Sequence, residues 1–234
     1  MAKNIYISPS DQTANKYAYG NTNEAVVCRK IADAAAVALN RCGFNVKNNK
    51  TSSMAARVAE SDKWGADLHL PIHTNAFNGK TSGTRLFCWS KSGEGYKACK
   101  AIFSVLAPLT PGTSENITVD TTLYEIRYPA APTAYIEVDF HDVKDVAKWI
   151  IENVEEIGEA ICQGVCDYFG VAYVPKELPE KKQIVLGEYD TLREADDVLG
   201  NIYATIASLE TALDDAKTYA SKLEAALKNA KVVG

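Results

Sequence analysis

Short apolar runs alternate with longer segments of helical apolar spacing through the first part of the chain. Apolar runs bounded by turn residues are typical of buried strands, and longer capped segments are typical of helices. The segment 24–41 shows the second type, because Thr22 or Asn23 can cap its start and Gly43 ends it. The pattern predicts strands over 5–7, 44–46, 67–72, 83–89 and 134–138, helices over 24–41, 53–64, 94–107 and 143–169, and a strand or a short helix over 123–126.

This alternation predicts an α/β domain. Strands joined by crossover helices form a mainly parallel sheet with helices on both faces. In such folds the ligand binds beyond the carboxyl ends of the strands. Polar residues directly after strand ends are therefore the first candidates for chemistry.

The chain changes character after Gly170. A polar segment containing Pro175 and Pro179 follows, which is typical of a linker. The pattern predicts a domain over 1–174, a linker over 175–190 and a C-terminal coiled-coil helix over 191–234. The apolar seam of this last segment has strict three–four spacing and consists of Leu192, Ala195, Leu199, Ile202, Ile206, Leu209, Leu213, Ala216, Ala220, Leu223, Leu227 and Ala230.

The heptad seam predicts that this segment associates. A helix packed on its own domain would show a wider stripe with a 3.6-residue period, so a coiled coil or a helical hairpin is favoured. Small residues beside the seam, such as Ala212 and Ala226, suit more than two helices or an antiparallel arrangement. We expect a homo-oligomer that dissociates when the chain is truncated after about Pro179, with the first domain still folded.

Composition restricts the partners of the protein. The 234 residues are 47% hydrophobic and 24% charged, which is enough apolar material for a packed core. The net charge of −5 argues against nucleic acid or an anionic membrane as a main partner. No apolar run approaches the ~20 residues of a membrane span, and no signal peptide opens the chain, so we expect cytoplasmic synthesis without membrane insertion.

The six cysteines lie in apolar or helical stretches without a CxxC pair. This usage is typical of small buried thiols in a reducing compartment, and it predicts neither disulfides nor a structural zinc finger. The cysteines are Cys28, Cys42, Cys88, Cys99, Cys162 and Cys166.

Two of the three histidines belong to the strand 67–72 and its end. His73 directly follows this strand, next to the turn-forming Asn75. A histidine in this position suits a metal site or acid–base chemistry, although a capped loop residue is the alternative. His69 lies four residues earlier on the same face of the strand, and we predict that it is a hydrogen-bonded core histidine.

Two glutamates are notable for their positions. Glu137 lies inside the apolar strand 134–138, where burial of a carboxylate is costly unless it has a partner cation or a chemical task. Glu24 opens the helix 24–41, where the helix dipole alone also accounts for a glutamate.

Together these segments resemble the zinc-dependent N-acetylmuramoyl-L-alanine amidases of the Amidase_3 type, which include many bacteriophage endolysins and bacterial cell-wall hydrolases. The resemblance implies a six-stranded twisted sheet, one bound Zn²⁺ and peptidoglycan as the substrate. It runs from about Lys3 to Val174 and rests on Ile5-Tyr-Ile-Ser-Pro-Ser, on Glu24 at a helix start, on Asp67-Leu-His-Leu-Pro-Ile-His73-Thr-Asn-Ala and on Tyr135-Ile-Glu137-Val-Asp-Phe-His141-Asp.

The resemblance assigns roles residue by residue. Glu24 and His73 match zinc ligands of the family, and Glu137 matches its catalytic glutamate. The family's first zinc-binding histidine has no counterpart, because the chain reads Ser-Pro-Ser-Asp11-Gln12 where the family usually has Asp-Pro-Gly-His-Gly. An aspartate oxygen is the better zinc ligand and a glutamine oxygen the weaker one. We favour Gln12 over Asp11, because Ser-Pro-Ser-x-Gln looks like a variant opening of this family.

The implied reaction is hydrolysis of the amide between N-acetylmuramic acid and the L-alanine of the stem peptide. Zinc would activate water and polarise the carbonyl, and Glu137 would accept the proton of the water as general base. His141 is placed to orient the substrate or stabilise the oxyanion, or it is simply a residue before a helix. Asn15, Asn75 and Glu125 are weaker candidates for lining the substrate cleft.

Two other interpretations stay open. The missing histidine suits a non-catalytic amidase-like module that binds peptidoglycan, although a binder does not need a buried strand glutamate. The heptad segment suits an assembly protein with the globular domain as its cap. For the enzyme, the absence of a signal peptide favours a phage endolysin, made in the cytoplasm and acting on the cell wall after release.

Overall fold

The computed structural model describes residues 2–49, 53–176, 199 and 202. The chain divides into two units, Met1–Glu177 and Leu178–Gly234, and all assigned strands and numbered helices belong to the first. The predicted linker from residue 177 onward and the predicted coiled coil lie outside the described residues, apart from Leu199 and Ile202. Within the described part, no helix is long and apolar enough to cross a membrane.

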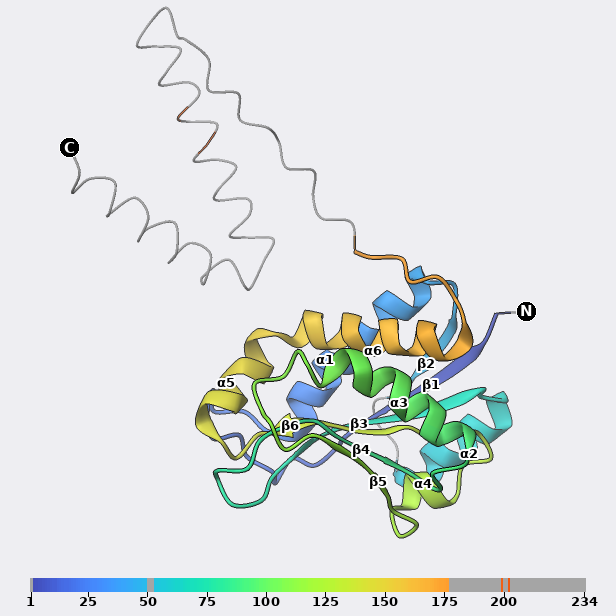
Figure 1. The fold of residues 1–234 in the computed structure, drawn as a ribbon, viewed down its shortest axis with the longest axis horizontal. Coiled ribbons are helices and arrows are strands. Elements are labelled where there is room, and N and C mark those ends of the chain that lie inside the picture. The colour runs from blue at the N-terminus through green and yellow to red at the C-terminus, as the bar shows by residue number, and fades with distance from the viewer. Residues whose placement is uncertain (1, 50–52, 177–198, 200–201, 203–234) are drawn as a thin grey trace, which may run out of the picture. The chain divides into compact units, whose positions relative to one another are not determined.

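A six-stranded sheet forms the centre of the first unit (Figure 1). Its strand order is β2-β1-β3-β6-β4-β5; β4 is antiparallel to β6, and all other neighbouring pairs are parallel. This arrangement confirms the predicted mainly parallel α/β sheet. The strands are β1 (Asn4–Pro9), β2 (Asn45–Asn48), β3 (Leu68–Asn75), β4 (Arg85–Cys88), β5 (Asn116–Val119) and β6 (Tyr135–Phe140).

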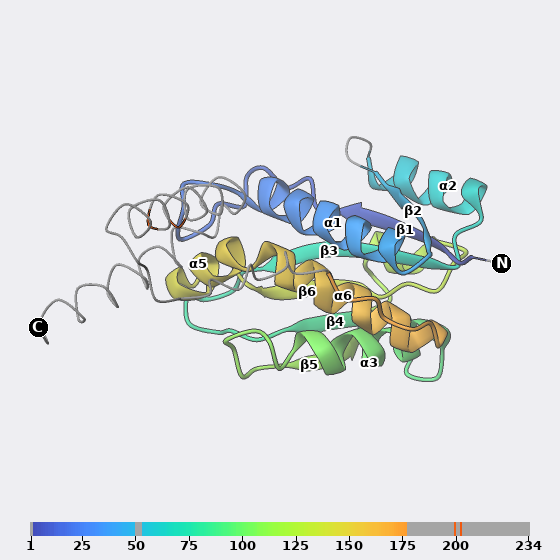
Figure 2. The same cartoon turned by 90° about the horizontal axis from the view of Figure 1, so that it is seen from above.

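Helices cover both faces of the sheet. On one face, α6 packs between α1 and α3 (Figures 1 and 2). On the other face α2 and α4 pack against each other. The helices are α1 (Glu24–Arg41), α2 (Met54–Trp64), α3 (Glu94–Leu106), α4 (Tyr124–Arg127), α5 (Lys144–Glu152) and α6 (Val154–Phe169).

Alternation along the strands makes the two faces chemically different, because successive side chains point to opposite sides. Ile5 of β1 and Leu70 of β3 belong to the large apolar core that includes α1, α3 and α6. Tyr6 points the other way, and its hydroxyl hydrogen-bonds Glu60 of α2 at 2.8 Å. His69 of β3 shares this second face and stacks on Tyr6 with ring centroids 5.3 Å apart. Tyr6 and His69 thus lie together on the α2 and α4 side of the sheet.

The helix predicted over 143–169 is interrupted, so that prediction was wrong in detail. Asn153 separates α5 from α6 with φ −119° and ψ 28°, outside the helical region. Its side-chain Nδ2 donates to the Trp149 carbonyl oxygen at 2.8 Å. Asparagine side chains compete with helical backbone hydrogen bonds in this way, which favours them at helix ends.

The region between α3 and β6 also differs from the prediction. The short edge strand β5 was not predicted, since its sequence Asn-Ile-Thr-Val leaves only Ile117 partly buried and gives a weak pattern. The ambiguous segment 123–126 is the start of helix α4.

Glycine allows α6 to lie close to its neighbours. A Cβ atom at Gly164 would collide with the backbone of Ile102 in α3, and one at Gly158 would lie 2.6 Å from the Cβ of Ala34 in α1. These two positions fix the helical layer that supports the sheet from one side.

Candidate active site

His73 and Glu24 meet at the carboxyl end of β3. His73 is the sixth residue of the eight-residue strand, and its Nδ1 lies 2.8 Å from Oε1 of Glu24. Glu24 is the first residue of α1, whose N-cap Asn23 accepts a hydrogen bond from the Val26 amide. Both side chains are almost fully buried. The strand end and the helix start therefore bring together the two residues predicted as metal ligands.

The electrostatics of this pair favour its charged forms. Burial opposes the charge on Glu24, but its hydrogen bonds to His73 and Asn15 lower its pKa below the ordinary value. Burial likewise acts to lower the pKa of His73, but the bond to Glu24 and the nearby charge of Glu137 outweigh it and raise the pKa. A cation is strongly favoured at this point, whether a proton or a metal ion.

Gln12 lies beside this pair and is held by Asn15. The amide Nε2 of Gln12 is 3.4 Å from Nδ1 of His73. Nδ2 of Asn15 lies 2.9 Å from Oε1 of Gln12 and 2.6 Å from Oε2 of Glu24. Asn15 thus bridges two of the predicted ligands, a role that its position in the sequence did not indicate.

Asp11 is engaged elsewhere. Its Oδ2 lies 3.2 Å from Nη2 of Arg57, and its side chain is 59% exposed. Arg57 is itself buried on α2, and its Nη1 donates to the Pro9 carbonyl oxygen at 2.6 Å. The Arg57 guanidinium therefore orients the segment after β1, turning Asp11 outward while Gln12 approaches His73. The sequence did not indicate this role of Arg57, because a charged residue is ordinary in a polar helix such as α2.

Glu137 stands next to His73 in the sheet. The two residues are register partners of the parallel strands β6 and β3. The Oε2 atom of Glu137 is buried without a hydrogen-bond partner among the described residues. Burial raises the pKa of Glu137 to about 8; the positive charge on His73 opposes this rise and Glu24 adds to it. A carboxyl group with this pKa can exchange a proton near neutral pH.

His141 follows β6 and is fixed by hydrogen bonding and stacking. Its Nδ1 lies 3.0 Å from Oγ1 of Thr74, which in turn lies 2.9 Å from the Tyr17 hydroxyl. The imidazole stacks on the Tyr17 ring at a centroid distance of 4.9 Å. Burial lowers the pKa of His141, so a neutral imidazole is favoured. The residue is buried and well ordered by its partners, adjacent to the backbone that carries His73.

His69 and Glu125 form a second buried pair, deeper in the sheet. Nδ1 of His69 lies 3.0 Å from the Ser61 hydroxyl, and its Nε2 lies 3.3 Å from Oε1 of Glu125. The Ser8 hydroxyl donates a short hydrogen bond to the same Glu125 oxygen. The prediction that His69 is a hydrogen-bonded core histidine is confirmed, and Glu125 belongs to this network. Asn75 accepts a backbone hydrogen bond from His141 at 2.8 Å.

The donor set at the strand end fits a zinc ion with open coordination positions. Glu24 supplies a carboxylate oxygen and His73 an imidazole nitrogen, both common zinc ligands. Rotating the Gln12 amide by a half turn would present its oxygen instead of its nitrogen. In the described part of the chain, Nε2 of His73 and Oε2 of Glu137 are buried without hydrogen-bond partners, as expected where a further group is to be bound.

Comparisons with known proteins identify a family for the first unit. Residues 5–167 match the Amidase_3 family, described as N-acetylmuramoyl-L-alanine amidase. No curated protein sequence matches the chain.

Solved structures share the fold at low sequence identity. The catalytic domain of CwlV, an N-acetylmuramoyl-L-alanine amidase from Bacillus (Paenibacillus) polymyxa var. colistinus, has a TM-score of 0.66 and 15% identity, covering 73% of this chain and 99% of that one. The N-acetylmuramoyl-L-alanine amidase AmiC2 of Nostoc punctiforme has a TM-score of 0.63 and 16% identity, covering 72% and 97%. The catalytic domain of the CD27L endolysin targeting Clostridia difficile has a TM-score of 0.57 and 21% identity, covering 71% and 97%.

Proposed function

Since the chain belongs to the Amidase_3 family of N-acetylmuramoyl-L-alanine amidases, we propose that it hydrolyses the amide between N-acetylmuramic acid and the L-alanine of the peptidoglycan stem peptide. One observation carries the proposal. Glu24, His73 and Glu137 converge where β3, β6 and α1 meet, and two of their buried polar atoms lack hydrogen-bond partners among the described residues. This arrangement supports a hydrolytic site rather than a packed core.

The proposed cofactor is one Zn²⁺ held by Glu24, His73 and Gln12. Gln12 is preferred to Asp11 because it lies beside His73, while Asp11 pairs with Arg57. When bound, zinc lowers the pKa of a coordinated water and polarises a carbonyl group. A neutral amide is a weaker ligand than the imidazole usual in the family, so we expect weaker metal binding than in relatives with that histidine.

Glu137 is the proposed general base and acid. A carboxylate beside His73 can remove a proton from the attacking water and return it to the leaving amine of L-alanine. Its raised pKa supports both halves of this transfer near neutral pH, because neither the charged nor the neutral form is strongly disfavoured.

His141 is proposed to stabilise the oxyanion or orient the substrate. Its Nδ1 is engaged with Thr74, and its ring is held against Tyr17. This restraint would keep Nε2 in a fixed direction, as required of a group that donates to developing negative charge.

Exchange of Glu137 tests the proposed function. We expect Glu137→Gln to lower amide hydrolysis by about 10²–10⁴-fold, the usual range for a general base, with the fold and metal content retained. The assay measures new N-terminal alanine released from purified peptidoglycan, with added Zn²⁺ and with a chelator. Glu152→Gln is the matched control, because Glu152 lies on α5 with its side chain 43% exposed.

One result would reject Glu137 as the general base, and a second would reject the enzyme. Activity of Glu137→Gln within about threefold of the parent would remove Glu137 from the mechanism, since a general base contributes far more. A purified chain without transition metal, inactive even after Zn²⁺ is added, would favour the non-catalytic peptidoglycan-binding module, which the missing histidine also suits.

The heptad segment is proposed to join several copies of the enzyme. Its seam, from Leu192 to Ala230, would be buried by association. We expect truncation after Pro179 to yield a monomer that keeps its specific activity. Sedimentation of both chains at tens of micromolar measures this, and a monomeric full-length chain would refute oligomerisation without affecting the proposed chemistry.

A further inference from the structure

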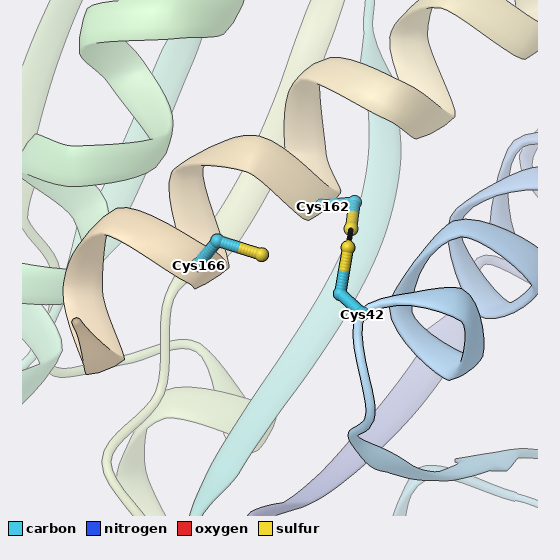
Figure 3. A group of neighbouring side chains, drawn as sticks. All are labelled: Cys42, Cys162 and Cys166. Carbon is cyan, nitrogen blue, oxygen red and sulfur yellow. Dashed lines mark hydrogen bonds between the residues drawn. The ribbon is translucent and has the colours of Figure 1, made fainter. Parts of the chain in front are cut away.

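Three cysteines form a cluster between the end of α1 and the middle of α6. Cys42 directly follows α1, while Cys162 and Cys166 lie one turn apart on α6, and all three point toward one another (Figure 3). Their sulfur atoms all lie within 4.8 Å of one another, and Sγ of Cys162 is 3.6 Å from Sγ of Cys42. All three are buried and free, as the sequence led us to expect. Nothing in the proposed hydrolysis uses them.

The spacing of these sulfurs matches a metal site. A tetrahedral zinc ion with Zn–S distances of about 2.3 Å places its sulfur ligands about 3.8 Å apart. The pair Cys42–Cys162 already has this separation. Cys166 needs only a side-chain adjustment on the order of 1 Å to complete the triangle, because no sulfur pair exceeds 4.8 Å.

The surroundings of Cys42 supply a hydrogen-bond donor to its sulfur. The Val174 backbone N–H donates to Sγ of Cys42 at 3.3 Å, a contact that stabilises negative charge on sulfur. The Val174 carbonyl is in turn held by Nε of Arg41 at 2.8 Å. Arg41 also pairs with Glu159, so a cationic side chain is fixed beside the cluster. An N–H bond to the ligand atom and a nearby cation are the kinds of outer contacts found around metal thiolates.

We propose that Cys42, Cys162 and Cys166 form a three-thiolate site for a soft d¹⁰ cation, Zn²⁺ or Cd²⁺, with an exogenous ligand in the fourth position. Soft thiolates select such ions over Mg²⁺ or Ca²⁺. The ion would fasten the end of α1 and the chain near Val174 to α6. Because Cys42 comes 18 positions after Glu24 along α1, the two metal sites would lie about 27 Å apart and are independent.

Binding at this site is coupled to loss of protons. Burial raises the pKa of Cys166 to about 12 and raises that of Cys162 above its ordinary value, so these two thiols stay protonated in the metal-free chain at neutral pH. The metal must displace these protons, and its apparent affinity is therefore expected to rise with pH.

The test is metal binding by the reduced full-length chain carrying His73→Ala, which removes the proposed catalytic site from the measurement. After treatment with a chelator, the chain is titrated with Co²⁺, whose thiolate complexes absorb in the near ultraviolet, and then with Zn²⁺ or Cd²⁺. We expect one equivalent of Co²⁺ with a thiolate charge-transfer band, displaced by either d¹⁰ ion. A hundredfold excess of Zn²⁺ over its Kd should raise Tm by about 5–10 °C.

Cysteine exchanges then locate the site. We expect Cys166→Ala to lose the band and the Zn²⁺-dependent rise in Tm, and Cys99→Ala, a buried helical cysteine outside the cluster, to keep both. Absence of the band from the reduced His73→Ala chain overturns the proposal, even if a cysteine variant fails to fold. A band that survives Cys166→Ala overturns it as well. Neither result bears on amide hydrolysis, which Glu137→Gln tests separately.

Discussion

Two histidine–glutamate pairs lie on the same face of β3, four residues apart, and they differ in how completely the protein satisfies them. Each histidine stacks on a tyrosine, His69 on Tyr6 at 5.3 Å and His73 on Tyr135 at 4.7 Å between ring centroids. Both nitrogens of His69 have protein partners. His73 contacts Glu24 through Nδ1, while its Nε2 has no hydrogen-bond partner among the described residues.

The difference separates a structural polar network from a candidate active site. Buried polar groups are normally hydrogen-bonded, and each exception requires an explanation. At His73 there are two such exceptions. Nε2 of His73 and Oε2 of the neighbouring Glu137 are both buried without a hydrogen-bond partner among the described residues. Around His69, Oε2 of Glu125 and Oγ1 of Thr133 are also buried without partners among the described residues, but both ring nitrogens of His69 are hydrogen-bonded and the other Glu125 oxygen has two partners. Two neighbouring buried atoms without hydrogen-bond partners, on different strands, indicate a binding site for a further group.

The largest expected effect distinguishes the two histidines directly. His73→Ala should remove the zinc proposed at the end of β3, leaving only any zinc at the cysteine cluster, and lower amide hydrolysis by at least about 10²-fold, because too few protein ligands remain at the β3 site. His69→Ala should keep the zinc but lower the free energy of unfolding by about 3 kcal/mol, since it leaves the buried Glu125 carboxylate without its histidine partner and with the Ser8 hydroxyl as its remaining hydrogen-bond donor. Metal content, hydrolysis and denaturant unfolding of both variants measure this. Equal loss of zinc in the two variants would contradict the assignment of His73 as a metal ligand and His69 as a structural residue.

The sequence predicted the sheet and the position of the site more reliably than the contacts within it. The strand before His73 and the cap before Glu24 have strong local patterns, so both residues could be located at element ends. The bridging role of Asn15 depends on a loop conformation that brings it to Gln12 and Glu24. Loop asparagines are too common for the sequence to single one out.

The break at Asn153 and the edge strand β5 escaped prediction for a related reason. The apolar pattern continues through Asn153, where α5 ends and the asparagine side chain hydrogen-bonds the Trp149 carbonyl oxygen. β5 is held by pairing with β4, between residues 31 positions apart in the sequence, and no local pattern predicts such a pairing. Local signals therefore located the elements, while tertiary contacts determined their ends and the sheet edge.

The second prediction contrasts the pH dependence of two glutamates in metal-free protein. The pKa of Glu137 is raised from its ordinary 4.5 to about 8, so Glu137 contributes stability below pH 4.5 that is lost as the pH rises toward 8. For Glu125, burial acts to raise the pKa, but hydrogen bonds from His69 and Ser8 outweigh it and lower the pKa. Glu125 therefore contributes stability above its unfolded pKa, and this is lost as the pH falls through its folded pKa.

Glutamine variants measure these opposite pH dependences of the free energy of unfolding. In the presence of a chelator, Glu137→Gln should gain stability relative to the parent between pH 4.5 and 8, by a few kcal/mol. Glu125→Gln should instead lose less stability than the parent when the pH falls below about 4.5. Urea unfolding across this pH range measures both. If both glutamates changed the free energy of unfolding with pH in the same direction, their environments would be equivalent, contrary to the difference inferred between Glu137 and Glu125.

The smallest effect concerns the residue that replaces the missing histidine. Gln12 lies 3.4 Å from His73, whereas Asp11 pairs with Arg57. We expect Gln12→Ala to weaken zinc binding by about 10–100-fold, no more than the loss of an outer-shell partner usually costs, because a neutral amide is the weakest of the three proposed ligands. Asp11→Ala should leave zinc binding unchanged and reduce stability by less than about 1 kcal/mol, because its carboxylate is largely exposed.

A gain-of-binding variant makes this last prediction decisive. Gln12→His replaces a neutral amide with an imidazole, a stronger zinc ligand, so zinc affinity should rise above that of the parent. Competition with a chromophoric chelator measures the affinities of all three variants. If Asp11→Ala loses zinc while Gln12→Ala and Gln12→His match the parent, the aspartate is the ligand, and the segment after β1 must rearrange to release it from Arg57.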